Sequence, residues 1–437
     1  KRIPISEWQN IGIIVTDEAW IRISRSLGEE LPSLGEITNS TRGVLITDEA
    51  LDSEDADTPI LTDSFLRYES LNPDTVAKWE NLKERPPNTD WFHNERLLVR
   101  RLVSRSNRLL ATMAEDRFVS KKDTYIFKSA AVPIPALLSL VNSLFISWWH
   151  FNVELAASKD DFRQITLSAL RNLPMPDGIK KTNVCSGGDS RIDTKFERYL
   201  RNEFSAAKLR ESVNVDNYWL LNWLPSQLID LKKQRAEVNT NLLDYLRPYS
   251  DGRKLHDVKI YQPPEGVSNA MLSATKDDYK NLRIGSVICE RNAENTVVIN
   301  ATARYKPDDE DAYETDQWGY TETEPMPAMR LTDLSETVAD LVEAFVPVAV
   351  EKAGGFAGFR ETATKTNSLI DRLEAIALPK PDDVANDVAR YWDAVERAEE
   401  LDNKIQKTDE LIDEIVYDLY DLTDEEIEIV EEAIGDS

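Results

Sequence analysis

Cysteine and histidine are scarce in this 437-residue chain, which has two cysteines (Cys185, Cys289) and three histidines (His93, His150, His256). A disulfide framework needs more cysteines than this, and a Cys/His zinc site needs a set of closely spaced ligands, so neither class fits. A Ser-His-Asp triad also has little to build on.

Long hydrophobic runs are missing as well. The longest apolar stretches, Ala130–Leu140 and Leu144–Trp149, are too short for a membrane span or contain proline. We recognise no signal peptide. These features predict a soluble cytoplasmic protein with no membrane partner. The chain starts at Lys1 instead of Met, which suggests a piece of a longer protein.

What the chain has in excess is negative charge, and that charge is unevenly placed. The net charge is −27, yet residues 306–437 hold 37 acidic against 11 basic residues, while residues 1–305 hold 42 against 41. Such a tail repels phosphate, so any nucleic acid should bind to the first two thirds of the chain. One interpretation of the acidity is adaptation to high salt. A dedicated site for a protein partner, or a DNA-mimicking tail, is the alternative.

The length and the 41% hydrophobic content suffice for two or three domains with real cores. Short β-branched and aromatic segments between polar turns predict a small antiparallel or mixed sheet, with strands at 34–38, 43–47, 59–62, 65–68, 97–103 and 124–127. Helices are expected over 134–155 and 162–172, and Trp148 and Trp149 should lie in the core.

The rest of the chain predicts helices, then strands, then helices again. A linker around Cys185–Ser190 precedes helices at 193–210 and 223–246, the second with Pro225 near its first turn. Strands are expected at 257–261, 282–291 and 296–304, and helices at 331–350, 364–376, 384–420 and 424–434. Thr423 and Glu426 form a capping box for the last helix. The fold class is therefore α+β.

A basic stretch, residues 96–128, is the candidate for DNA contact, with nine basic against three acidic residues. Arginine suits both a phosphate contact and a bidentate contact to guanine. In a strand over 97–103, Arg100 and Arg101 would point to opposite faces, so at most one could face DNA. The alternative is a solvated face with structural ion pairs. The candidate residues are Arg96, Arg100, Arg101, Arg105, Arg108, Arg117, Lys121 and Lys122.

Aromatic residues nearby have two interpretations. They could stack on bases, but half-buried strand aromatics more often belong to a core. The residues concerned are Phe65, Tyr68, Trp91, Phe92, Tyr125 and Phe127.

Several segments, in their order along residues 34–176, resemble a known family. These are Pro59–Tyr68, Leu98-Val-Arg-Arg101, Asp123–Phe127, the Leu-Leu-x-Leu-x-Asn-Ser run Leu137–Ser143, Asp161–Ile165 and the closing Leu173-Pro-Met-Pro176. Together they resemble the TaqI-like C-terminal specificity domain of adenine-specific DNA methyltransferases and fused restriction-modification enzymes. The ending Ile412–Ile427 is similar to the last helices of large fused modification enzymes, including those of BREX-type phage defence.

The catalytic motifs of such enzymes are not found in this sequence. An adenine methyltransferase needs an Asn-Pro-Pro-aromatic loop for the flipped base, but Asn72-Pro73 is followed by Asp74, and Arg85 precedes Pro86-Pro87. Gly354-Gly355 with Gly358 lacks the strand-turn-helix setting of a cofactor loop. Asp230–Lys232 and Asp402–Lys404 resemble nuclease fragments but lie in helical patterns.

The resemblance implies recognition of double-stranded DNA for an adenine-specific methyltransferase, with no catalytic, cofactor or metal residues in this chain. The catalytic domain, in cis or in trans, would bind S-adenosylmethionine. We expect four parts: a target-recognition domain (1–182), a helical connector (183–250), a small α+β region of unknown role (251–382) and acidic C-terminal helices (383–437). Two alternatives remain. One is an interaction module whose apolar faces at 192–246 and 399–434 bind proteins; the other is a self-contained enzyme of unfamiliar type.

Overall fold

The structure is a computed structural model that divides into two compact units. Unit 1 comprises Lys1–Glu237 and Glu400–Ser437, and unit 2 comprises Val238–Glu399. The structure describes residues 23, 31–51, 55–87, 89–102, 107–153, 165–179, 190–213, 215–258, 260–262, 271–274, 279–292, 295–308, 313–351 and 368–435. The fold is α+β, as predicted. These two units do not coincide with the four parts expected from the sequence. The roles assigned to those four parts remain predictions.

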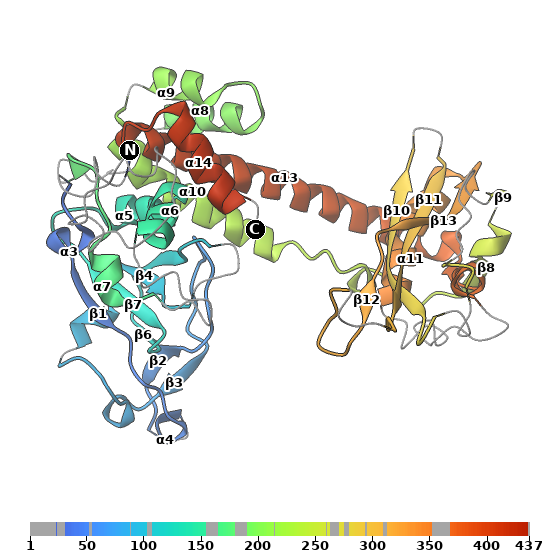
Figure 1. Ribbon diagram of the computed structural model, residues 1–437, viewed down its shortest axis with the longest axis horizontal. Helices are drawn as coiled ribbons and strands as arrows, with labels where there is room; N and C mark the ends of the chain where they lie inside the picture. The colour runs from blue at the N-terminus through green and yellow to red at the C-terminus, as the bar shows by residue number, and fades with distance from the viewer. Residues whose placement is uncertain are drawn as a thin grey trace. The chain divides into compact units, whose positions relative to one another are not determined.

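Two small sheets form the first part of unit 1 (Figure 1). The larger is antiparallel, in the order β1-β7-β4-β5; the smaller has the order β3-β2-β6, with β2 and β6 parallel. The strands are β1 (Asn39–Arg42), β2 (Thr58–Leu61), β3 (Thr75–Ala77), β4 (Arg96–Arg100), β5 (Ala111–Ala114), β6 (Val119–Ser120) and β7 (Thr124–Lys128). The short helices between them are α3 (Leu34–Ile37), α4 (Asp48–Leu51), η1 (Trp79–Asn81) and η2 (Thr89–Phe92).

The central strands β4 and β7 of the larger sheet are buried, whereas the edge strand β1 is more exposed. Leu97 and Val99 of β4 belong to a core that includes the helices, whereas Leu98 belongs to a separate core formed with the smaller sheet. Alternate residues of a strand point to opposite faces, so the all-apolar centre of β4 fits a strand between two cores.

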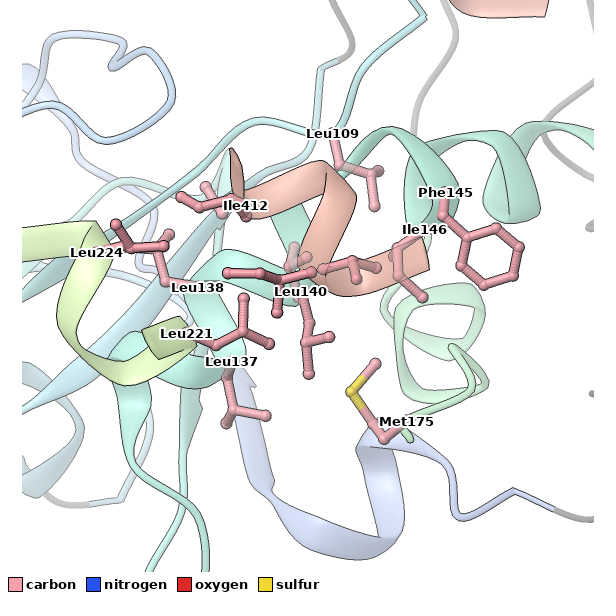
Figure 2. Packing of buried hydrophobic residues seen from close by; sticks show 14 of the residues in the cluster. Leu109, Leu137, Leu138, Leu140, Phe145, Ile146, Met175, Leu221, Leu224 and Ile412 are labelled. Atoms are coloured by element: carbon pink, nitrogen blue, oxygen red, sulfur yellow. The ribbon is translucent and has the colours of Figure 1, made fainter. Parts of the chain in front are cut away.

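Helices lie on one side of this sheet, where α5 (Ile134–Asn142) contacts β4 and β5 directly. The helices that follow are α6 (Leu144–Val153), α7 (Leu167–Arg171), α8 (Ser190–Leu200), α9 (Ala206–Val213) and α10 (Asn217–Glu237), of which α10 packs against α5. Figure 2 shows the core between them, where Leu137, Leu138 and Leu140 of α5 lie with Leu221 and Leu224 of α10. Burying each of these side chains is worth roughly 1.5–3 kcal/mol.

The last helices of the chain complete unit 1. α13 (Pro381–Leu419) starts in unit 2 and ends in unit 1, and α14 (Asp424–Gly435) follows it. Ile412 and Val430 are buried in the same core as α5, as is Phe196 of α8. The apolar faces that the interaction-module alternative would have offered to partners, at 192–246 and 399–434, are thus largely covered within the chain.

Unit 2 is built on a five-stranded sheet with the order β10-β11-β13-β9, in which β12 also pairs with β11. The strands are β9 (Ile260–Gln262), β10 (Arg283–Arg291), β11 (Val297–Tyr305), β12 (Thr321–Glu322) and β13 (Met326–Thr332). A second pair joins β8 (Asp251–Lys254) to β14 (Ala377–Pro379). The helical elements are η5 (Leu242–Asp244), η6 (Leu255–Asp257), α11 (Glu336–Glu351), α12 (Leu369–Glu374) and the first part of α13.

Several predicted elements have different bounds in the structure. Phe65–Tyr68 is a loop, not a strand, and Tyr68 has a positive φ of 55°. The predicted helix 134–155 divides at Ser143, and 193–210 is two helices. Pro225 lies inside α10, which starts earlier than predicted. Trp148 and Trp149 are core residues, as expected.

Within the described residues, no single helix is long and apolar enough to cross a membrane. The pair Ile134–Asn142 and Leu144–Asn152 passes that test only when taken together, and it bends by 61°. Apolar side chains of both helices belong to the core of unit 1.

Candidate nucleic-acid interface

The basic stretch 96–128 runs through β4, β5, β6 and β7, and the structure gives its members different roles. Arg96 and Arg100 share the Leu98 side of β4 because they alternate with Leu97 and Val99. That side faces the core of the smaller sheet. The side chains of Arg96 and Arg100 therefore do not project from a solvent-exposed face of β4.

Arg96 is fully buried. Its guanidinium donates to the carbonyl of Asn94 at 3.0 Å and to that of Phe118 at 3.4 Å, and it lies 4.5 Å from the Phe118 ring centre. Burial lowers its pKa to about 10. Arg96 is thus a structural residue of the small core, and we remove it from the set expected to contact DNA.

Arg100 and Arg101 lie where β4 ends. The Nη1 of Arg100 donates to the carbonyl of Phe65 at 3.0 Å, which fixes the loop after β2. The backbone of Arg101 is bonded on both sides, to Asp123 O at 2.8 Å and from Ile165 N at 2.9 Å. Both side chains are half-buried. Because the strand stops at Arg100, the predicted strand 97–103 was too long; Arg105 lies outside the described residues.

Arg108 belongs to a buried ionic cluster with Arg67, Asp409 and Asp413. Its guanidinium lies 3.4 Å from the carboxylate of Asp409 and 3.5 Å from that of Asp413, and Arg67 also pairs with Asp409. These four side chains are between 8% and 16% exposed. Arg108 therefore connects α13 to the segment that precedes β5 and, like Arg96, leaves the set expected to contact DNA.

The cluster also explains the break between α5 and α6. A break frees one backbone carbonyl and one N–H, which need partners when buried. Arg67 Nη1 and Arg108 Nη2 both donate to Asn142 O at 2.9 Å, and Leu144 N donates to Asp413 Oδ1 at 2.7 Å. The Asn142 side chain pairs with both backbone groups of Ala111, at 2.9 and 3.0 Å.

The two carboxyl groups of the cluster have opposite pKa shifts. Burial raises the pKa of Asp413 to about 7, and Arg108 only partly offsets it. Burial would also raise the pKa of Asp409, but the charges of Arg67 and Arg108 outweigh it and hold that pKa below its usual value. Burial lowers the pKa of Lys232 on α10 to about 8, with a further contribution from Arg67.

The exposed cations of the stretch lie in the loops on either side of β6. Arg117 is exposed and Lys121 is half-exposed, and neither side chain has a hydrogen-bond or ion-pair partner among the described residues. Lys122 pairs with Glu84 at 2.7 Å. Of the predicted residues that the structure describes, Arg117 and Lys121 are therefore the best placed to meet phosphate.

The aromatic candidates are mostly core residues. Tyr68 and Phe127 are fully buried, and Phe65, Phe92 and Tyr125 are at most 5% exposed. Trp91 alone of the six is half-exposed. Within the residues that the structure describes, no group of three or more His, Cys, Asp or Glu side chains could hold a metal ion.

Four charged residues in and beside this cluster were not predicted as site residues: Arg67, Lys232, Asp409 and Asp413. One signal was available, because Asp409 and Asp413 are four residues apart and Asp413 lies within the apolar face formed by Ile412 and Val416. A carboxylate in such a face needs a buried partner. The identity of that partner, hundreds of residues earlier in the chain, was not accessible from one sequence.

Part of unit 1 is similar to a known protein family. Residues 60–175 match the family model described as a TaqI-like C-terminal specificity domain. The match runs from β2 to the Leu-Pro-Met-Pro segment, whose Leu173 and Met175 are buried. These residues are therefore similar to TaqI-like specificity domains, and the predicted resemblance is confirmed over this range.

A curated relative is described as a putative type II restriction enzyme and methyltransferase, from Methanocaldococcus jannaschii. It is 30% identical over 162 residues, which are 35% of this chain and 14% of that protein. The chain thus corresponds to a small part of the relative's length.

Two solved structures are also similar. The type I restriction-modification S subunit from M. genitalium has a TM-score of 0.37 and 12% identity, covering 89% of this chain and 96% of the other. The HsdS subunit from Thermoanaerobacter tengcongensis has a TM-score of 0.25 and 14% identity, covering 90% and 96%. Both scores are too low to establish a shared overall fold.

Proposed function

We propose that this chain recognises DNA sequence for an adenine-specific DNA methyltransferase or a fused restriction-modification enzyme. The observation that carries the proposal is the specificity-domain match at residues 60–175. It coincides with the basic stretch of an otherwise acidic chain. The curated relative, described as a restriction enzyme and methyltransferase, supports the same context.

In this proposal, cations near β6 hold the DNA backbone while neighbouring loops contact base edges. Arg117 precedes β6 and Lys121 follows it, so the two Cα atoms are at most about 14 Å apart. Two cations at such a separation can contact phosphates of one DNA strand, which fixes the orientation of the domain without specifying sequence.

We assign methyl transfer to a catalytic half in cis or in trans. This assignment rests on the sequence, because no Asn-Pro-Pro-aromatic loop or glycine-rich cofactor turn was found in it. S-adenosylmethionine and double-stranded DNA are then the ligands of the whole enzyme, whose natural role would be phage defence. Adenine specificity predicts transfer of a methyl group to the N6 amino group when both halves are combined.

The test is a binding titration of the full chain on random-sequence duplex DNA at several potassium chloride concentrations. The variant is Arg117→Glu/Lys121→Glu. The control is Arg201→Glu/Lys208→Glu, which makes the same charge change at exposed positions near α8 and in α9. We expect wild type and control to lose affinity with salt in the same way. The variant should bind more weakly, with a salt slope smaller by about 2.

Two results would contradict the proposal. One is a folded chain that binds no duplex even at low salt. The other is an equal loss in the variant and the control, which would mean that total charge, not the region around β6, sets the affinity. Circular dichroism at each salt concentration establishes that the chain is folded.

A further inference from the structure

An open pocket of about 530 Å³ lies in unit 1 beside the edge strand β1. Its walls come from α3 and β1, from η2, from the end of β7 and from the end of α7, and include Ser40, Asp90, Trp91, Lys128 and Arg171. Its size is within the range of small-molecule sites. Of its cations, Lys128 ends the basic stretch, and Arg171 lies beyond it.

The two cations of this pocket are held in place by the protein and keep donors to spare. Lys128 Nζ donates to the carbonyls of Asp90 and His93, and an ammonium has three donors. Arg171 donates from Nε to Ser40 Oγ at 2.8 Å and from Nη2 to Ser40 O at 3.3 Å, whereas a guanidinium has five N–H groups. One ammonium and three guanidinium donors thus remain for an anion.

The other walls offer an aromatic surface and an acceptor. Trp91 is half-exposed and packs against the core of the smaller sheet, which limits its motion. The side chain of Asp90 is 74% exposed, and its Oδ1 lies 3.2 Å from His93 Nε2. An ionised carboxylate only accepts hydrogen bonds and has room for about four, so it favours ligands that carry an amino group.

We propose that this pocket binds a single unpaired nucleotide whose base carries an exocyclic amino group. Arg171 and Lys128 hold the phosphate, Trp91 stacks with the base, and Asp90 accepts from the amino group. The inference rests on the proposed function, since DNA is then the source of the nucleotide. A nucleotide displaced from the duplex and a free mononucleotide have the same chemistry, and the test separates them.

The test uses the full chain with mononucleotides as probes, in isothermal titration calorimetry. The probes are dAMP, dCMP, TMP and deoxyadenosine. We expect dAMP and dCMP to bind at least about tenfold more tightly than TMP, because the thymine base has no exocyclic amino group to donate to Asp90. Deoxyadenosine should lose a similar factor because it has no phosphate for Arg171 and Lys128. A five-nucleotide single strand that binds more tightly than dAMP would identify DNA as the source.

The variants assign the contacts. Arg171→Ala should weaken dAMP binding at least tenfold, whereas Arg201→Ala, an exposed arginine elsewhere in unit 1, should leave it unchanged. Asp90→Asn should reduce the preference for dAMP over TMP. Trp91→Phe keeps a ring in the core and should retain part of the affinity; Trp91→Ala should lose it.

The outcomes separate this inference from the proposed function. Duplex binding without binding of any mononucleotide or single strand overturns the pocket and leaves the proposed function intact. Mononucleotide binding without duplex binding supports the pocket and contradicts the proposed function. Binding of dAMP that survives Arg171→Ala unchanged places the nucleotide elsewhere and also overturns the inference.

Discussion

At the scale of single residues, arginines in one basic stretch have opposite roles. Arg96 is buried and bonded to main-chain carbonyls, while Arg117 is exposed and has no partner among the described residues. Nothing in local sequence separates them. The difference arises because Arg96 lies on the same side of β4 as Leu98, and that side faces the core of the smaller sheet.

This difference is testable with the same substitution at both positions. Arg96→Met leaves the carbonyls of Asn94 and Phe118 without donors and should lower the free energy of unfolding by roughly 1–3 kcal/mol. The DNA affinity of the folded variant should not change. Arg117→Met should do the reverse, with unchanged stability and weaker binding. Urea unfolding measures the stability of each variant, and duplex titration measures its affinity for DNA. If both variants changed stability and affinity in the same way, the assignment of different roles to Arg96 and Arg117 would be wrong.

The ionic cluster predicts a pH effect at Asp413. Its pKa is raised to about 7 by burial, so the folded state favours the neutral carboxyl. The stability that this gives is complete below the ordinary pKa of about 3.9 and is lost as the pH rises toward 7. Asp413→Asn is neutral at every pH and keeps an oxygen for Leu144 N.

The stability of Asp413→Asn relative to wild type should therefore rise between about pH 4.5 and pH 7.5, by roughly 1–3 kcal/mol. Urea unfolding at the two pH values and one salt concentration measures it. Asp418→Asn, a more exposed position on the same helix, serves as the control. A relative stability that stays flat or falls with pH would show that Asp413 is ionised in the folded protein.

At the scale of elements, the bend between α5 and α6 depends on Asn142. This side chain is fully buried and bonds both backbone groups of Ala111. Asn142→Ala leaves the buried N–H of Ala111 unpaired, while the Ala111 carbonyl keeps the N–H of Tyr68 at 3.1 Å. We expect the substitution to cost roughly 1–3 kcal/mol in thermal or urea unfolding. Asn152→Ala removes a single bond to Trp148 O from a partly exposed residue and should cost less. Equal effects would mean that the bend does not depend on the Asn142 pairing.

The elements also show what the sequence could and could not predict. The hairpin of β10 and β11 was predictable because both strands alternate and turn residues separate them. The Glu426 cap of α14 was also predictable from local spacing, and Glu426 accepts from Thr423 N at 2.9 Å. The break at Ser143 was not, because its stabilisation comes from Arg67 and Asp413, far apart in the chain.

The candidate site divides in the same way. The family resemblance of residues 60–175 was carried by local motifs, and the comparison confirms it. The pocket beside β1 combines Ser40, Asp90, Lys128 and Arg171, which no local pattern connects. The order of motifs along the sequence predicted the resemblance to TaqI-like specificity domains. The burial of individual side chains and the pairing of distant residues could be known only from the three-dimensional structure.

At the scale of the whole molecule, unit 1 is assembled from two distant segments, with residues 238–399 between them. A chain ending after Glu399 would lack Asp409 and Asp413, and Arg67 and Arg108 would remain as uncompensated charges. We expect such a truncation to abolish cooperative unfolding of unit 1 and the hydrogen-exchange protection of β4 and β5. A chain ending after Gly435 is the control and should behave like the full protein. Protection of β4 that survives the loss of residues 400–437 would show that the last helices are dispensable.

The discontinuity of unit 1 has a consequence for synthesis of the protein. At about 5–20 residues per second, the ribosome takes on the order of ten seconds or more to add residues 238–399. During that time α5 and the sheet have already emerged but lack their final helices, while the whole of unit 2 becomes available to fold. The nascent part of unit 1 is thus left with an uncovered apolar face and with Arg67 and Arg108 unpaired, until residues 400–437 are translated and pack against it.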